Sequence, residues 1–128
     1  MSKILILESD RLLANNIAKF LAGRGHSATC VVEPQAAVLA ADTDCPDAVI
    51  LDLFLASRGG LEFLYEFRTY ADWKNVPAVI FTSLPVAELA SCADELEHLN
   101  IHAFCHKAHT SLAQLAGYVE QALAPAHA

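Results

Sequence analysis

The stretch KILILESDRLL, residues 3–13, decides the fold class. Its four consecutive aliphatic residues, 4–7, run without alternation into the polar cluster Glu8, Ser9 and Asp10. An apolar run with no alternating polar residues is typical of a strand that is covered on both faces, as in a parallel sheet. The acids would then lie just beyond the carboxyl end of that strand, where sheets of this kind carry their chemistry.

Four further apolar runs have the same character, at residues 28–32, 48–51, 76–81 and 101–105. The segments between them show helical spacing of apolar residues, for example Leu13, Ile17 and Leu21 in the first and Val86, Leu89, Ala90, Ala93 and Leu96 in the fourth. Strands that alternate with helices imply right-handed crossovers and helices on both faces of a parallel sheet. The pattern predicts an α/β fold of (βα)5 type, a doubly wound five-stranded parallel sheet.

The ends of several helices carry recognisable signals. Gly23 and Gly25 are expected at the end of the first helix, and Pro34 suits the first turn of the second. Either Ser9 or Asp10 can cap the first helix, and Thr110 or Ser111 can cap the last.

Length and charge restrict the classes of function. A chain of 128 residues is most simply one domain, and we expect a folded unit over residues 1–123 and a short tail over 124–128. Eight basic against fifteen acidic residues give a net charge of −7, which disfavours nucleic-acid binding. No apolar run approaches the ~20 residues of a membrane span, and the start does not resemble a secretory signal. We therefore expect an intracellular, cytoplasmic protein that does not bind membranes.

Four cysteines stand outside any C-x-x-C spacing, at positions 30, 45, 92 and 105. In a chain without an export signal they are expected as small core residues rather than disulfides. Trp73 is expected as a partly covered loop residue.

Polar residues follow four of the five predicted strands: Glu8, Asp52, Thr82 and, one residue beyond His106, Lys107. Two carboxylates at one sheet edge repel each other unless a cation joins them, and a hard divalent cation prefers oxygen ligands. A carboxylate can also act as a nucleophile toward phosphorus. A hydroxyl and an ammonium beside it would stabilise charge on the transferred oxygens.

The sequence PDAVILDL, residues 46–53, followed by Gly60, resembles the phosphoacceptor strand and loop of the receiver domains of two-component response regulators. The resemblance to these CheY-like proteins extends over essentially the whole chain. It implies the flavodoxin-like strand order 2-1-3-4-5.

The resemblance also implies roles for individual residues. Asp52 is the expected phosphoacceptor, Thr82 and Lys107 the groups that contact the phosphoryl oxygens, and Phe104 the switch aromatic. Mg²⁺ is the expected cofactor, with Glu8, Asp52 and the backbone carbonyl of Phe54 as ligands.

Three positions depart from the family pattern. Ser9 replaces the second acid after the first strand, Ala56 replaces a loop proline, and Ala108 replaces the proline that follows the lysine. Loss of a direct carboxylate ligand would weaken Mg²⁺ binding by on the order of a hundredfold or more. Asp10 is a further candidate ligand, directly or through a water. The cation site is therefore expected to be incomplete.

Two functions follow from the resemblance. The first is a phosphorylatable receiver, which takes a phosphoryl group on Asp52 from a sensor histidine kinase or a histidine phosphotransfer protein. It would signal to a downstream protein through its fourth helix, fifth strand and fifth helix, and it would catalyse only its own phosphorylation and dephosphorylation. The alternative is a pseudo-receiver, an interaction module with a defective metal site that is not phosphorylated. Homodimerisation through the fourth and fifth helices stays open.

Two other kinds of site are not expected. The sequence IHAFCHKAHT, residues 101–110, superficially resembles a transition-metal site, but on a strand His102 and His106 face away from Cys105. No Gly-rich loop follows the first strand, so a nucleotide or flavin cradle is not supported.

Overall fold

The five strands form one parallel sheet. The computed structural model describes residues 2–53, 60–91 and 96–123, and its sheet has the order β2-β1-β3-β4-β5. The strands are β1 (Lys3–Leu7), β2 (Ser27–Val31), β3 (Ala48–Leu51), β4 (Ala78–Thr82) and β5 (Ile101–His106). All neighbouring strands pair in parallel. The predicted fold class and strand order are confirmed.

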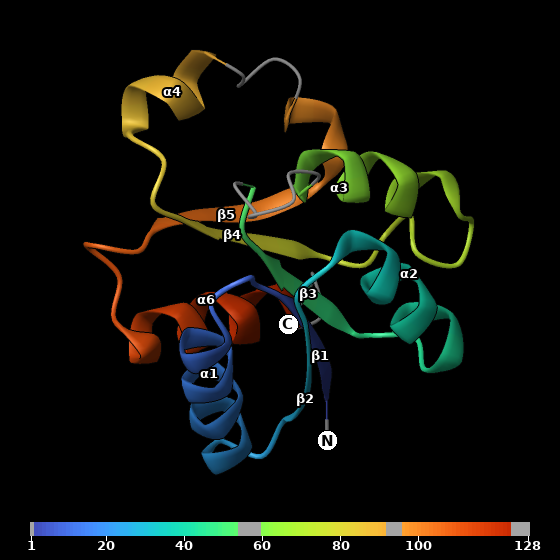
Figure 1. Cartoon of the computed structure of the whole chain (residues 1–128), viewed down its shortest axis with the longest axis horizontal. Helices are drawn as coiled ribbons and strands as arrows, with labels where there is room; N and C mark the ends of the chain where they lie inside the picture. The colour runs from blue at the N-terminus through green and yellow to red at the C-terminus, as the bar shows by residue number, and fades with distance from the viewer. Residues whose placement is uncertain (1, 54–59, 92–95, 124–128) are drawn as a thin grey trace.

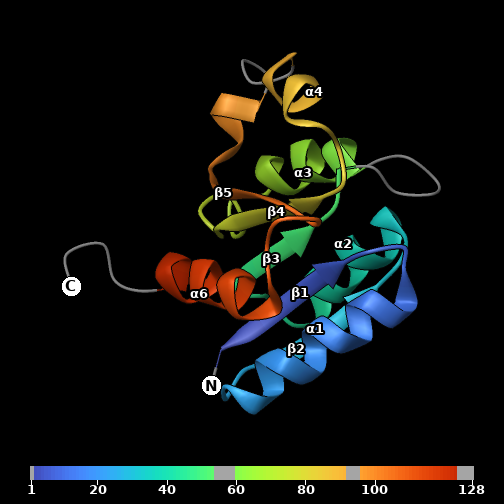
Figure 2. The ribbon, with the colours of Figure 1, turned by 90° about the vertical axis from the view of Figure 1, so that its left-hand side faces the viewer.

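Helices cover both faces of the sheet (Figure 1). They are α1 (Arg11–Gly23), α2 (Pro34–Thr43), α3 (Gly60–Thr69), α4 (Val86–Ser91), the 3-10 helix η1 (Glu97–Leu99) and α6 (Leu112–Leu123). The buried side chains of α1 and α6 belong to one core cluster, and those of α2 and α3 belong to the other. Figure 2 shows the sheet between these two helical layers.

The alternation of side chains along each central strand explains why its sequence is apolar throughout. In β1, Leu5 and Leu7 enter the α2–α3 core, whereas Ile4 and Ile6 enter the α1–α6 core. Successive strand residues point to opposite faces, and here both faces are covered. Only the three central strands are buried at almost every position.

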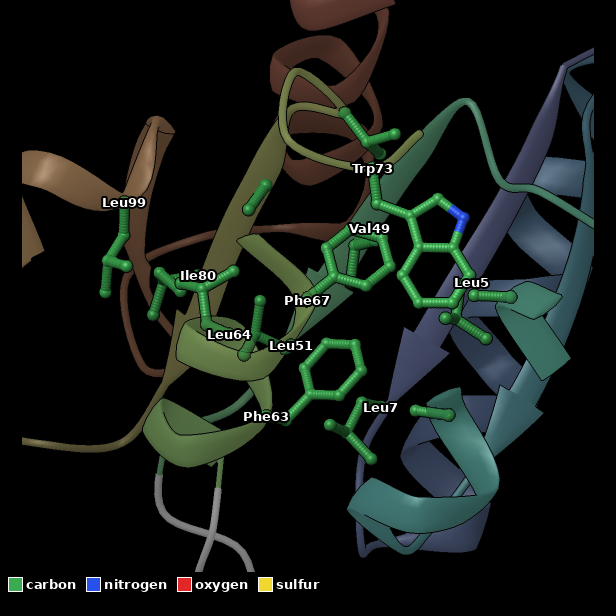
Figure 3. Packing of buried hydrophobic residues seen from close by; sticks show 14 of the residues in the cluster. Leu5, Leu7, Val49, Leu51, Phe63, Leu64, Phe67, Trp73, Ile80 and Leu99 are labelled. Carbon is green, nitrogen blue, oxygen red and sulfur yellow. The ribbon is translucent and has the colours of Figure 1, made fainter. Parts of the chain in front are cut away.

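An aromatic group fills the α2–α3 core, and it includes Trp73 (Figure 3). The Trp73 side chain is 5 % exposed and stacks on Phe67, with ring centroids 5.0 Å apart. Phe67 in turn lies 5.2 Å from Phe63. The expectation of a partly covered loop residue was wrong, because the turn after α3 folds this large apolar ring back into the core.

The fourth strand begins later than its apolar run. Val76 is buried, but its N–H donates to the carbonyl of Trp73 in a turn (3.2 Å). Pro77 has no N–H to donate to a ladder, and its carbonyl accepts from Val49 (3.0 Å). β4 therefore starts at Ala78 rather than at residue 76.

The predicted apolar stripe of the fourth helix is described only in part. α4 covers Val86–Ser91, and Ala90 is exposed, so Ala90 does not belong to a buried stripe. Leu96 is buried, as expected, and Ala93 lies outside the described residues.

The residues that the sequence predicts at the ends of α1, α2 and α6 lie at those ends. Pro34 opens α2, and Gly25 follows α1 in the left-handed region (φ 90°). Ser111 Oγ accepts from the N–H of Gln114 (3.1 Å), whose side-chain oxygen accepts from the N–H of Ser111 (2.8 Å). This reciprocal pair is a capping box, and it gives the cap of α6 to Ser111.

The cysteines differ in their surroundings. Cys105 is buried, Cys30 is half-buried with its thiol 3.5 Å from the Ala14 carbonyl, and all three described cysteines are free thiols. Cys45 is exposed in the loop before β3, so the expectation of a core residue was wrong there. Cys92 lies outside the described residues.

The proposed boundary between residues 1–123 and a tail over 124–128 stays a prediction, because 124–128 lie outside the described residues. None of the helices in the described ranges combines the length and the apolar character that crossing a bilayer requires.

Candidate functional site

The sheet brings the predicted polar residues to one edge. Glu8 directly follows β1, Asp52 follows β3, Thr82 ends β4 and Lys107 follows β5. Main-chain hydrogen bonds continue the sheet ladder into this region. The N–H of Asp52 donates to the main-chain carbonyl of Leu7 (3.2 Å), and the N–H of Lys107 donates to the main-chain carbonyl of Thr82 (2.8 Å). The carboxyl ends of four strands therefore supply the four side chains.

The two acids share one ammonium group. Lys107 Nζ lies 2.7 Å from Glu8 Oε1 and 2.8 Å from Asp52 Oδ2. The Glu8 side chain is 4 % exposed and that of Asp52 is 6 % exposed. Burial of two carboxylates side by side is unfavourable unless a cation compensates them, and in this structure Lys107 does so.

The surroundings of Lys107 act in opposite directions on its charge. Burial by itself lowers the pKa of Lys107, but the hydrogen bonds to Asp52 and Glu8 and the attraction of both carboxylates outweigh it. The net effect raises the pKa of Lys107 above the usual lysine value. The ammonium is therefore firmly protonated at neutral pH.

Thr82 is fully buried at the end of β4. Its Oγ1 accepts a hydrogen bond from the N–H of Leu84 (3.3 Å), which holds the start of the following loop. A threonine hydroxyl can still donate its own proton while it accepts this bond.

A pocket opens beside the phosphoacceptor candidate. It has a volume of about 260 Å³ and is lined by Asp52, Ser83, Leu84 and Pro85. Sequence reasoning named Thr82 but missed the three residues that follow it. Their position directly after a strand end was the signal that could have found them.

The backbone around Asp52 is tightly packed. A Cβ atom at position 60 would lie 2.3 Å from the Asp52 carbonyl oxygen and 2.8 Å from Leu53 Cα. Gly60, which the resemblance singled out, thus lets the start of α3 approach the end of β3 closely.

Asp10 caps α1 and does not join the acids around Lys107. Its Oδ1 accepts from the N–H of Leu13 (3.1 Å), so it, rather than Ser9, is the N-cap. Its own N–H donates to Glu8 Oε2 (3.0 Å). Within the described residues no three His, Cys, Asp or Glu side chains form a group that could hold a metal. This placement does not support Asp10 as a ligand.

The remaining predicted residues lie on β5, directly after Lys107, or outside the described residues. Phe104 on β5 is 47 % exposed. Ala108 is exposed, follows a trans peptide bond, and donates its N–H to His106 Nδ1 (3.1 Å). Phe54 and Ala56 lie outside the described residues, so neither the carbonyl ligand nor the loop substitution can be placed.

Comparison with known proteins agrees with this geometry. No family model matches the chain. Over 83 residues, or 65 % of its length, the chain is 30 % identical to the KDP operon transcriptional regulatory protein KdpE of Escherichia coli, and the match covers 36 % of that protein. The chain spans about a third of the length of the curated relatives it matches.

Solved structures match over almost the whole chain. A sensor protein from Polaromonas superposes with a TM-score of 0.85 over 95 % of each chain, at 18 % identity. The chemotaxis response regulator CheY4 of Vibrio cholerae superposes with a TM-score of 0.83 over 96 % of this chain and 99 % of that one, also at 18 % identity. At such low identity these matches show the fold alone.

The curated sequence matches include response regulators, and the fold of the chain is that of CheY-like receiver domains.

Proposed function

We propose that the chain accepts a phosphoryl group on Asp52 from a sensor histidine kinase or a histidine phosphotransfer protein. The observation that carries this proposal is the convergence of a buried carboxylate, a lysine ammonium 2.8 Å away and a threonine hydroxyl at one sheet edge. The pocket of about 260 Å³ beside Asp52 gives a phosphoryl donor access to the carboxylate.

The proposed transfer needs only groups of this pocket and the donor. An Asp52 oxygen attacks the phosphorus of a phosphohistidine, and a P–O bond forms as the P–N bond breaks. The histidine nitrogen leaves with the bonding electron pair. Lys107 then offsets the charge on the phosphoryl oxygens, and the Thr82 hydroxyl donates to one of them. The module would catalyse its own phosphorylation and dephosphorylation rather than turn over a separate substrate.

The signal would leave through the surface formed by α4, β5 and α6. If Thr82 moves toward the phosphoryl group, the space it vacates can admit the Phe104 ring, which is 47 % exposed in this structure. Such a change shifts an existing equilibrium between two forms of the surface. The proposed recipient is a downstream protein or a second copy of the chain.

The described pocket does not fit Mg²⁺ as a resident ion. Glu8 and Asp52 both bind Lys107, Glu8 Oε2 also accepts from Asp10, and Ser9 offers no carboxylate. Mg²⁺ normally takes six oxygens at short distances in near-octahedral geometry. We therefore propose that the pocket binds Mg²⁺ weakly. Glu8, Asp52 and the Phe54 carbonyl would be its ligands. The phosphoryl transfer described above does not require the ion.

A pseudo-receiver is the second candidate. The same ion pairs favour it, because Lys107 pairs with both buried carboxylates in the absence of metal or phosphoryl group. In that case the α4, β5 and α6 surface would bind its partner constitutively, and Asp52 would serve only as a counter-ion.

The proposed partners are proteins rather than nucleic acids. The net charge of −7 opposes direct contact of this chain with phosphate backbones. Exchange with a histidine kinase implies a cytoplasmic location.

Incubation with phosphoramidate, a small phosphoryl donor that resembles phosphohistidine, distinguishes the two candidates. We expect intact-mass spectrometry to show one added phosphoryl group, absent in Asp52→Asn and retained in the exposed control Asp42→Asn. Amide NMR with beryllofluoride should show matching shifts around Thr82. A wild-type chain that takes up no phosphoryl group at saturating donor, with or without Mg²⁺, would leave the pseudo-receiver as the function.

A further inference from the structure

We infer that His106 positions the main chain that carries Lys107, by accepting a hydrogen bond from the main-chain N–H of Ala108. This N–H donates to His106 Nδ1 over 3.1 Å. Proline, the residue of the family pattern at position 108, has no N–H and could not make this bond. The inference rests on the proposed function and deepens it, because it names a residue that controls the geometry of the phosphoryl-accepting site.

His106 accepts both hydrogen bonds of the turn that follows β5. Its main-chain carbonyl accepts from the N–H of His109 (3.0 Å), which closes a four-residue turn with Lys107 and Ala108 at its centre. Neither central residue has a positive φ, so the turn fits type I. Type I turns favour Asp, Asn or Ser in the first position, and the side chains of these residues can accept from the N–H two residues on. In this turn an imidazole nitrogen supplies that acceptor.

The main chain of Lys107 is held from both sides. The Lys107 N–H donates to the Thr82 carbonyl (2.8 Å), and His106 stands opposite Thr82 in the register of β4 and β5. A small displacement of a positioned group can slow a reaction strongly, because the reacting groups must meet within a narrow range of distance and angle. A looser turn should therefore misplace the ammonium that faces the incoming phosphoryl oxygens.

The hydrogen bond from Ala108 also determines the chemical form of His106. An Nδ1 atom that accepts a hydrogen bond carries no proton, so the neutral imidazole has its proton on Nε2. The His109 ring packs beside the imidazole, with ring centroids 5.1 Å apart and a tilt of 36°. His106 acts on Lys107 through the turn, which makes it a positioning residue.

Phosphoryl uptake from phosphoramidate tests the acceptor. His106→Leu removes it, and we expect uptake on Asp52 to slow by roughly threefold to tenfold, the effect of one lost hydrogen bond. His106→Asn keeps an acceptor for the same N–H and should restore most of the rate. His102→Leu, exposed on the same strand, should react like the wild type. Equal slowing in His106→Leu and His106→Asn, or no slowing in His106→Leu, would overturn the inference.

Ala108→Pro tests the donor. A proline at position 108 has no N–H and suits the third position of a type I turn poorly, so we expect slower uptake than in the wild type. Because the donor is then already missing, adding His106→Leu should slow uptake no further. An additive loss in the double variant would mean that His106 does not act through the Ala108 N–H.

NMR of the resting protein tests the turn without phosphorylation. In the wild type, His106 Nδ1 should have the nitrogen shift of an unprotonated ring atom and a through-bond coupling to the Ala108 amide nitrogen. A neutral ring with its proton on Nδ1 would refute the inference, even if His106→Leu does not fold.

The position of Lys107 can be followed through Phe81, whose ring centroid lies 6.0 Å from Lys107 Nζ. Nuclear Overhauser contacts between the Lys107 side chain and this ring should weaken in His106→Leu and persist in His106→Asn. Unchanged contacts in His106→Leu would contradict a positioning role. If Asp52 takes up no phosphoryl group under any condition, the proposed function fails, and these contacts still decide whether His106 positions Lys107.

Discussion

Gly60 lies so close to Asp52 that a Cβ atom at position 60 would stand 2.3 Å from the Asp52 carbonyl oxygen. A main-chain oxygen cannot rotate away as a side chain can, so Gly60→Ala has to push α3 away from the end of β3. We expect the free energy of unfolding to fall by about 2 kcal/mol, measured by urea denaturation, and phosphoryl uptake on Asp52 to slow.

Gly117→Ala in α6 is the matched control. No atom lies within 4 Å of a Cβ at position 117, and the helix gains from alanine. We expect it to raise the free energy of unfolding by roughly 0.5–1 kcal/mol. If Gly60→Ala and Gly117→Ala changed the free energy of unfolding by the same amount, close packing around Gly60 would not explain the loss of stability in Gly60→Ala.

Arg68 connects the end of α3 to the start of β5. Its guanidinium donates to the carbonyls of Leu99 (2.7 Å), Trp73 (2.9 Å) and Asn100 (3.1 Å). Burial lowers the pKa of Arg68, yet an arginine this basic stays charged at neutral pH. Arg68→Met should cost about 2–3 kcal/mol, because three carbonyls lose a charged donor.

Arg68→Lys should recover only part of that stability, since an ammonium lacks the planar fork of donors. The exposed substitution Arg11→Met should change the urea midpoint little. A full recovery with lysine would mean that charge alone, rather than the three directed hydrogen bonds, holds this junction.

Thr82 connects the pocket to the loop after β4 through its bond from the Leu84 N–H. Thr82→Val keeps the shape and removes the hydroxyl, so we expect a loss of about 1–2 kcal/mol in stability. With beryllofluoride, the variant should still show shifts at Asp52 but none at Phe104. Thr82→Ser, which keeps the hydroxyl, should restore the Phe104 response in amide NMR. Shifts at Phe104 in Thr82→Val would remove Thr82 from the signalling route.

Glu120 on α6 carries a pH-dependent contribution to stability. Hydrogen bonds from Arg24 first and from His26 second (3.0 Å) lower its pKa from 4.5 to about 2. Because the pKa is lowered on folding, the contribution is complete above about pH 4.5 and is lost as pH falls toward 2. The side chain is 33 % exposed, so the effect should not exceed about 1 kcal/mol.

The difference in Tm between the wild type and Glu120→Gln should therefore be present at pH 6 and shrink at pH 2. Glu62→Gln, exposed in the first turn of α3, should show no such change. A difference that persisted at pH 2 would assign the effect to packing rather than to charge.

Most of the fold could be predicted because a strand that is buried on both faces has apolar residues at nearly every position of its sequence. The runs at β1, β3 and β4 are apolar throughout, and the polar residue after each run lies at the functional edge. Pro34 and Ser111 each mark the start of a helix through contacts within one turn, so these helix starts could also be predicted from the sequence. These features depend on neighbours in the sequence.

What could not be predicted depends on contacts across the chain. The partners of Lys107 are 55 residues or more away, and no local pattern says that one ammonium binds both Glu8 and Asp52. Trp73 is buried because a turn folds back onto α3, and Val76 leaves the strand because Pro77 follows it. The choice of Asp10 over Ser9 as cap depends on one hydrogen bond, from the Leu13 N–H to the Asp10 side chain.

The order in which the chain is made gives the Glu8–Lys107–Asp52 triad one more consequence. Both acids leave the ribosome long before Lys107, so a nascent chain ending before position 107 lacks the ammonium that these two acids share in the folded protein. Completion of the last strand would then act as the step that lets the acidic corner close. Ribosome-bound chains of increasing length should become resistant to protease only once that lysine has emerged.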